Sequence, residues 1–177
     1  MEFTPDATIN KLTLLFVLDK MEIPLTENSI IDICTSRNSW LNYMECKDIL
    51  WQLNEVGFIY NTDTESEEKR YGITVDGRNC LSHFFLRIPQ SLREQITQFV
   101  KENRMNFKRS QEYVSDYYKN PDGSHTVVLK IKEPLISQPL LEIKLKAPSR
   151  HLAITACRKW KDKAPVVFEH LYDTVID

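Results

Sequence analysis

The side chains that carry acid–base, nucleophilic and metal chemistry occur in this sequence without the spacing that such chemistry needs. The histidines lie singly, unlike the closely spaced ligands of a metal site. They are His83, His125, His151 and His170. The sequence contains no glycine-rich phosphate loop, nucleophile elbow, HExxH pair or calcium-binding loop. We therefore expect no enzymatic activity, no metal site and no cofactor.

The cysteines and the apolar runs indicate a cellular compartment. Cys34, Cys46, Cys80 and Cys157 lie far apart and form no CxxC pair, which is typical of reduced, mostly buried thiols. The first residues, MEFTPDATINK, lack the basic start and apolar core of a signal peptide. No run approaches the roughly 20 apolar residues of a membrane span. We expect a cytoplasmic protein that makes no membrane contact.

The charged side chains are the remaining candidates for function, and they are unevenly distributed. Residues 1–86 carry 7 Lys and Arg against 14 Asp and Glu, whereas residues 87–163 carry 16 against 8. Residues 164–177 carry three acids and no Lys or Arg. The acidic first half and the basic second half could attract each other, within one chain or between two copies.

The basic second half predicts an antiparallel sheet with a lysine-rich outer face. EYVSDYYKNPDGSHTVVLKIKEP predicts two strands around the turn NPDG, and QPLLEIKLKAPS predicts a third. Period-two alternation places four lysines on the outer face of this sheet. They are Lys130, Lys132, Lys144 and Lys146. Such a face could bind an anion, a nucleic-acid backbone or an acidic protein surface, or it could simply keep the sheet solvated.

The first half must bury an unusually apolar helix. LTLLFVL, within a helix predicted over residues 6–21, is apolar on nearly every side, so this helix is expected to be buried on more than one face. A unit of about 85 residues rarely covers such a helix alone. We expect the second half of the chain or a second copy to cover it, and we predict a homodimer.

A second amphipathic helix is predicted over residues 42–56. Cys46, Leu50 and Leu53 share one face, and Asn42 can cap the helix. Gly57 suits the positive φ angle that often ends a helix. Residues 58–73 then predict a β-hairpin, and a further helix starts behind Thr74.

This order of elements resembles the winged helix of bacterial regulators of the PadR and MarR kind. ILWQLNEVGFI is similar to a recognition helix that runs into a wing strand, and YGITVDGRNCL is similar to the second wing strand with its Y-x-[IL]-T-x-x-G motif. The resemblance covers residues 8–88 and implies a transcription regulator that binds double-stranded DNA. The whole chain also resembles an uncharacterised family of Gram-positive bacterial proteins of this length.

The resemblance implies that helix 42–56 enters a major groove, with hairpin 58–73 beside it. The DNA-binding candidates are Arg37, Asn42, Lys47, Trp51, Gln52, Lys69, Arg70 and Arg78. The charges oppose this function, because affinity for DNA comes largely from Lys and Arg. The helix contains one lysine, Lys47, and three acidic residues, Glu45, Asp48 and Glu55. The alternative is a protein-interaction or dimerisation module that uses the winged helix as a scaffold without DNA binding.

Two further features bear on this choice. Trp51 falls off the stripe of Leu50 and Leu53; an exposed tryptophan there is typical of a binding hot spot, whereas a buried one would pack under the second half. The hairpin loop, residues 62–68, holds four carboxylates that would repel phosphates. They belong to Asp63, Glu65, Glu67 and Glu68. We expect this loop to stay solvated or to dock on the lysine-rich sheet face.

Together these patterns predict an α+β protein of two domains. Residues 1–88 form the winged helix, and residues 89–177 form a domain with a helix, a three-stranded antiparallel sheet and two C-terminal helices. Pro89 marks the boundary, and Pro165 suits the first turn of the final helix.

Overall fold

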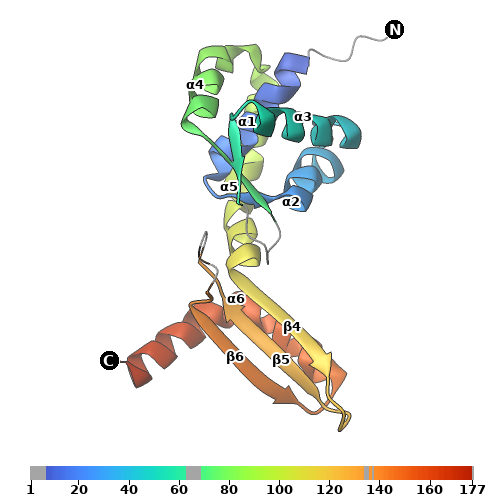
Figure 1. Ribbon diagram of the computed structural model, residues 1–177, viewed down its shortest axis with the longest axis vertical. Coiled ribbons are helices and arrows are strands. Elements are labelled where there is room, and N and C mark those ends of the chain that lie inside the picture. Colours follow the sequence, from blue (N-terminus) through green and yellow to red (C-terminus); the bar gives the residue numbers. More distant parts are fainter. Residues whose placement is uncertain (1–6, 63–68, 134–135, 137, 177) are drawn as a thin grey trace. The chain divides into compact units, whose positions relative to one another are not determined.

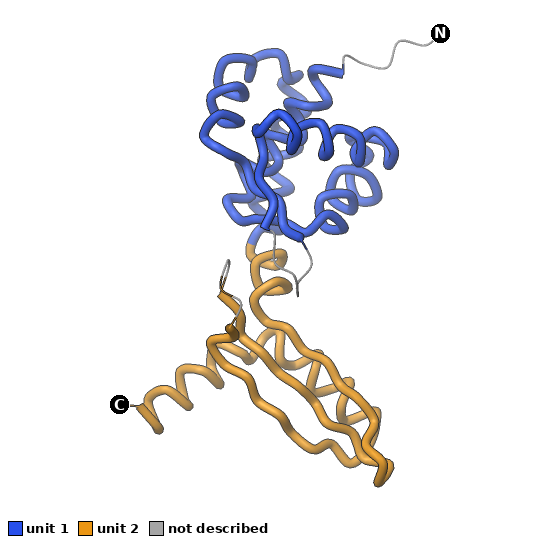
Figure 2. Tube along the Cα trace, viewed as in Figure 1, with its two compact units in different colours: residues 1–104 blue, residues 105–177 orange. Residues whose placement is uncertain are grey.

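Helices and antiparallel strands form two groups along the chain (Figure 1). The computed structural model describes residues 7–62, 69–133, 136 and 138–176. The groups make two units, residues 1–104 (unit 1) and residues 105–177 (unit 2), and the division falls within a helix (Figure 2). The domain boundary beside Pro89 stays a prediction. Each unit contains one three-stranded antiparallel sheet, which confirms the predicted α+β class.

Unit 1 is mainly helical. Its elements are α1 (Ala7–Met21), β1 (Leu25–Thr26), α2 (Glu27–Ile31), the π-helix η1 (Asp32–Arg37), α3 (Tyr43–Glu55), β2 (Ile59–Asn61), β3 (Arg70–Ile73), α4 (Val75–Phe84), the 3₁₀-helix η2 (Phe85–Arg87) and the first part of α5 (Gln90–Glu112). In its sheet, β3 lies between β1 and β2. The sequence did not predict β1, because a strand of two residues has no period to detect.

Helices α3 and α4 begin behind the predicted capping residues, and α3 also ends where the sequence predicts. The Asn42 Oδ1 atom accepts a hydrogen bond of 2.8 Å from the Glu45 amide, and the Thr74 Oγ1 atom accepts one of 3.1 Å from the Gly77 amide. These bonds satisfy amide groups that have no partner within their own helix. Gly57 has a φ of +77°, so the chain leaves α3 in the left-handed conformation and turns directly into β2.

Helix α1 is covered within unit 1. Leu14 and Val17 are fully buried, and α1 contacts α3, α4 and β3. Part of helix α5 also belongs to this unit: Ile96 is fully buried, and the Arg104 Nη1 atom lies 2.7 Å from the Glu22 Oε2 atom just beyond α1. This cover removes the reason for expecting a second copy on α1, and the oligomeric state stays a prediction.

Unit 2 packs a sheet against a long helix. Its elements are the end of α5, β4 (Tyr113–Lys119), β5 (His125–Ile131), β6 (Leu141–Ala147) and α6 (Arg150–Val175). The strands pair in the order β4-β5-β6. Along β5, Val127, Leu129 and Ile131 join the core that α6 covers, and the residues between them are more exposed. The three predicted strands are therefore confirmed.

The prediction of two C-terminal helices is wrong, because α6 continues without a break from Arg150 to Val175. Pro165 lies inside this helix, where proline removes one backbone hydrogen bond. The side chains of Trp160, Ala164 and Phe168 keep a spacing of four residues across the proline and pack in the same core. This packing offsets the lost hydrogen bond, so the proline does not start a new helix.

Two glycines provide a test of the close contact between the hairpin and α4. A Cβ atom on Gly77 would lie 2.1 Å from the backbone oxygen of Phe58, whereas a Cβ atom on Gly72 would meet the ring of Tyr60 at 2.5 Å. The Tyr60 side chain is partly exposed and can rotate away. We expect Gly77→Ala to lower the free energy of unfolding by about 1–3 kcal/mol, and Gly72→Ala to lower it less. Urea unfolding followed by circular dichroism measures both, and equal losses would contradict the expectation.

Candidate functional site

Helix α3 turns a mixed apolar and charged side outward. Its inner stripe, Cys46, Leu50 and Leu53, is buried as predicted. On the outer side Trp51 is 65% exposed and Met44 is 66% exposed. We define the α3 surface as Tyr43, Met44, Lys47, Asp48, Trp51, Glu55 and Val56, all of which are exposed. The exposure of Trp51 fits its position off the buried stripe.

An open hollow of about 330 Å³ adjoins Trp51 at the end of α3. Its lining comes from α1, α3 and the segment that follows α3. The lining residues are Lys11, Trp51, Gln52, Leu53, Glu55, Val56 and Phe58. Most of this lining is apolar, so the hollow can accept an apolar side chain from outside, and Lys11 and Glu55 are its charged lining residues.

Lys47, the one base of the α3 surface, forms an ion pair within unit 1. Its Nζ atom lies 3.1 Å from the Glu27 Oε1 atom and 5.8 Å from the ring centre of Tyr43. The hydrogen bond to Glu27, together with the charge of that carboxylate, raises the pKa of Lys47 above its ordinary value. The lysine is therefore charged but paired, which leaves the carboxylates of Asp48 and Glu55 to dominate the α3 surface.

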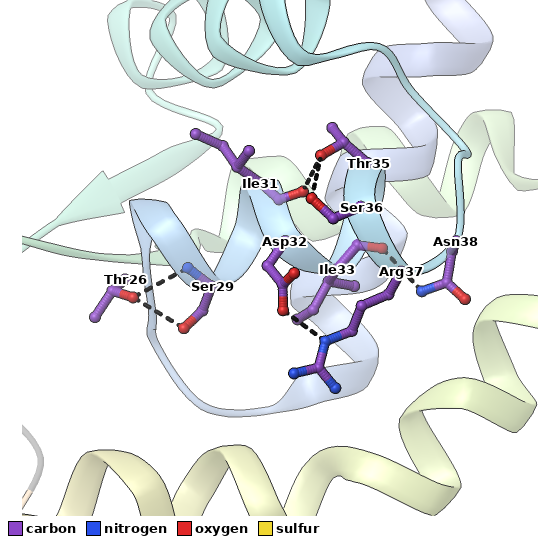
Figure 3. Close-up of polar contacts among 9 residues, drawn as sticks. All are labelled: Thr26, Ser29, Ile31, Asp32, Ile33, Thr35, Ser36, Arg37 and Asn38. Atoms are coloured by element: carbon purple, nitrogen blue, oxygen red, sulfur yellow. Dashed lines mark hydrogen bonds and ion pairs between the residues drawn. The ribbon is translucent and has the colours of Figure 1, made fainter.

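Two of the predicted DNA-binding arginines also form ion pairs. Within η1 the Arg37 Nε atom donates a hydrogen bond of 2.5 Å to the Asp32 Oδ2 atom (Figure 3). The Arg78 Nε atom donates one of 3.0 Å to the Asp19 Oδ1 atom of α1. About half of each arginine side chain is exposed, and ion pairs of this kind are worth roughly 1 kcal/mol or less. An anion that binds the guanidinium group more strongly could displace the carboxylate from either arginine.

The remaining DNA-binding candidates have different surroundings. Asn42 caps α3, and Gln52 lines the hollow. Lys69 is exposed just before β3. Arg70 lies in β3, where its amide donates a hydrogen bond of 3.0 Å to the Thr62 Oγ1 atom. The structure thus places Asn42, Lys47, Trp51 and Gln52 on or beside α3 and distributes the others over η1, the hairpin and α4. The side chains of the acidic loop, Asp63, Glu65, Glu67 and Glu68, lie outside the described residues.

The outer face of the sheet in unit 2 is basic, but Lys130, Lys144 and Lys146 have carboxylate partners. Glu142 lies between Lys130 and Lys144, whose Nζ atoms are 3.4 and 3.5 Å from its two carboxylate oxygens. The Lys146 Nζ atom lies 2.6 Å from the Asp122 Oδ2 atom. Lys132 follows β5, and its amide donates a hydrogen bond of 2.8 Å to the Glu112 carbonyl. This pairing reduces the charge that the face presents to an external anion.

Two of the cysteines lie together in the core of unit 1. Cys34 of η1 and Cys46 of α3 are fully buried, and Cys80 and Cys157 are partly buried. A hydrogen bond between the first two thiols, reinforced by burial, raises the pKa of Cys34, and the same bond lowers the pKa of Cys46. All four cysteines are free, as the sequence predicts.

Neither a cluster of metal ligands nor a membrane-spanning helix occurs in the described part of the chain. Within it, no three His, Cys, Asp or Glu side chains gather closely enough to hold a metal ion. No helix among the same residues has the length and apolar character to cross a bilayer.

The sequence missed several residues of this site, and the fold explains why. It predicted bases that face outward, but not the carboxylates that pair with them. Asp19 and Glu27 are distant in sequence from Arg78 and Lys47, so no local pattern could connect them. Asp32 and Arg37 share one helical segment. Of the three ion pairs, this is therefore the one that the local sequence spacing could have predicted.

The geometry describes an α+β protein of two units, with a helix in unit 1 that exposes apolar and acidic side chains. The chain belongs to the family described as Domain of unknown function (DUF4364), which matches residues 10–175. This agrees with the expected membership of an uncharacterised family; the match does not name a PadR or MarR regulator. Neither curated proteins nor solved structures gave a match to this chain.

The Asp122–Lys146 pair provides a pH test of the sheet surface. Hydrogen bonds from Lys146 and Ser124 hold the pKa of Asp122 well below its ordinary value of 3.8. Because the folded pKa is lower than the unfolded one, the carboxylate stabilises the fold fully above about pH 5, and this contribution declines as the pH falls below about 4. We expect Asp122→Asn to lower the Tm at pH 6, and the difference from the wild type to shrink towards pH 2.5. Asp116→Asn, on the outer face of β4, is the control. A difference that stays constant with pH would contradict the expectation.

Proposed function

We propose that residues 7–88 form a winged helix. The element order α1, β1, α2, α3, β2, β3, α4 and the strand order β1-β3-β2 support this arrangement. In such a fold α3 would be the recognition helix, and β2 and β3 would be the strands of the wing. The capped start of α3 and the direct turn at Gly57 into β2 fit this assignment.

We further propose that this winged helix is a protein-interaction module of the cytoplasm, with the α3 surface as its binding face. The observation that carries the proposal is the exposed Trp51 beside an apolar hollow, with Tyr43 and Met44 exposed on the same helix. Aromatic residues and methionine are enriched at protein interfaces, and tryptophan is frequent among the side chains that dominate binding energy.

The charges of the α3 surface select the chemistry of the partner. Asp48 and Glu55 are exposed, and Lys47 is paired with Glu27. A protein segment with apolar side chains flanked by Lys or Arg would fill the hollow and meet these carboxylates. The phosphates of DNA would instead meet repulsion from the same groups.

Site-specific photocrosslinking tests the protein partner directly. A photoreactive phenylalanine analogue replaces Trp51 in cells, and a second variant carries it at Leu86, which is exposed on η2 and does not belong to the α3 surface. We expect a crosslinked protein with the Trp51 variant and not with the Leu86 variant, and the crosslinked peptide should be apolar and rich in Lys or Arg. With this partner purified, Trp51→Ala should weaken binding at least about tenfold. Crosslinks to nucleic acid, or an acidic partner peptide, would overturn the proposal.

DNA binding is the second candidate function. It is supported by the resemblance to winged-helix regulators and by the exposure of Lys47 and Lys69 on α3 and the hairpin. On this proposal the ion pair of Lys47 with Glu27 opens when a phosphate competes for the lysine. Binding should then depend steeply on salt, since each phosphate contact releases counterions.

A comparison of three variants tests DNA binding. We expect Lys47→Ala and Arg70→Ala each to flatten the slope of log affinity against log salt by about one unit. Glu27→Gln frees Lys47 and should strengthen binding. Retention on genomic DNA fragments at low salt measures all three, and Lys163→Ala on α6 is the control. A wild-type protein that is not retained at low salt would exclude this function.

A further inference from the structure

Strand β6 forms one edge of the sheet in unit 2 (Figure 1). Within the described residues of that unit it pairs with β5 alone, so the backbone groups along its other side have no strand beside them. An edge of this kind can accept a further strand, and many proteins shorten or cover their edges to prevent such pairing. Strand β6 has seven residues and contains neither proline nor glycine, so it retains the ability to pair.

The inner face of the sheet is incompletely covered along β6. Val127 of β5 is buried, but Leu145, which lies opposite it in β6, is 50% exposed. Helix α6 packs mainly on β4 and β5, and Leu141 and Ile143 of β6 are only partly buried against the core. A further strand beside β6 would cover these apolar side chains.

The charges of β6 favour a second copy of the same strand in one register. Glu142 and Lys144 lie on the outer face, between the apolar residues of the inner face. If two copies of β6 pair in antiparallel orientation with Ile143 opposite itself, each Glu142 lies opposite Lys144 of the other copy. On the inner face, each Leu141 then lies opposite Leu145 of the other copy.

The alternative antiparallel registers are less favourable. A shift to either neighbouring register that keeps the inner faces together sets two copies of Glu142, or two copies of Lys144, directly opposite each other, and like charges in such positions destabilise a sheet. A register displaced by one residue would align the apolar face of one copy with the charged face of the other. The register centred on Ile143 therefore satisfies both faces of the strand.

We propose that β6 pairs with β6 of a second copy in this register, so that two three-stranded sheets join into one sheet about a two-fold axis at Ile143. A strand that is complementary to itself suffices for such an isologous contact. Lys144 is available for it: its side chain is 61% exposed, and its Nζ atom lies 3.5 Å from the Glu142 Oε1 atom of its own chain, an exposed pair that is readily rearranged. The contact is short, so we expect a dissociation constant in the micromolar range.

Complementary charge variants of the full chain test the dimer and its register. Light scattering should show the mass of the wild type rising from monomer towards dimer between about 1 and about 200 µM. Glu142→Lys and Lys144→Glu each set like charges opposite one another, and each variant alone should raise the dissociation constant at least about tenfold. An equimolar mixture of the two variants again sets unlike charges opposite each other at both positions and should recover dimer formation. A folding defect in either variant could not produce this recovery.

Asp116→Lys is the matched control for these variants. It makes a similar change of charge on the outer face of β4, the other edge of the same sheet, and should leave the dimer intact. A wild-type protein that stays monomeric at about 200 µM would show that the lysines protect the edge of β6, and would overturn the proposal. So would a dimer that both single variants leave unchanged, or a mixture that dimerises no better than either variant alone.

Disulfide trapping tests the position of the two-fold axis. In a background with Cys80→Ser and Cys157→Ser, Ile143→Cys should crosslink two copies, because residues directly opposite in an antiparallel pair lie at a spacing that a disulfide can bridge. Leu145→Cys, on the same face of β6, should not crosslink, because it lies opposite Leu141 of the second copy. Equal crosslinking of the two variants would indicate a parallel pair and overturn the proposal. Circular dichroism and the Tm establish that each variant is folded, and the result does not depend on the partner of the α3 surface.

Discussion

Helix α1 is apolar on nearly every side, and the arrangement of unit 1 follows from the need to remove it from water. Burial of apolar surface is the main favourable term in folding, so each side of α1 requires a neighbour. Helices α3 and α4 and strand β3 supply neighbours, and α5 adds Ile96 to the buried core. Ile96 lies in the part of α5 that belongs to unit 1, which extends to residue 104.

This cover also decides which side of α3 can bind a partner. The side with Cys46, Leu50 and Leu53 is used for the core, and Trp51 and Met44 are left outside. Lys47, the base on this side of α3, is paired with the Glu27 carboxylate of unit 1 itself. Burial and this ion pair leave Trp51, Met44 and the carboxylates of Asp48 and Glu55 exposed, which supports the proposed protein partner.

The local features of the fold could be predicted because they depend on near neighbours in the chain. Asn42 and Thr74 cap helices through bonds to residues three positions away, and the alternation in β5 and β6 reflects one core face and one solvent face. The prediction at Pro165 was wrong because it considered near neighbours alone. Locally it favours a helix start, but the contacts of Trp160 and Phe168 with the sheet hold the helix together across it.

The sequence by itself determined the α+β class, the strands of the hairpin and of the unit 2 sheet, the bounds of α1 and α3 to within one residue and the candidate bases, because periodicity and capping are short-range properties. Only the tertiary structure decided that Arg78 meets Asp19, that Lys47 meets Glu27 and that Trp51 borders a hollow. These contacts join segments that are far apart along the chain, and no local spacing encodes them. The charge of a surface depends on such pairs, so the side chains available to a partner become known only when the chain is folded.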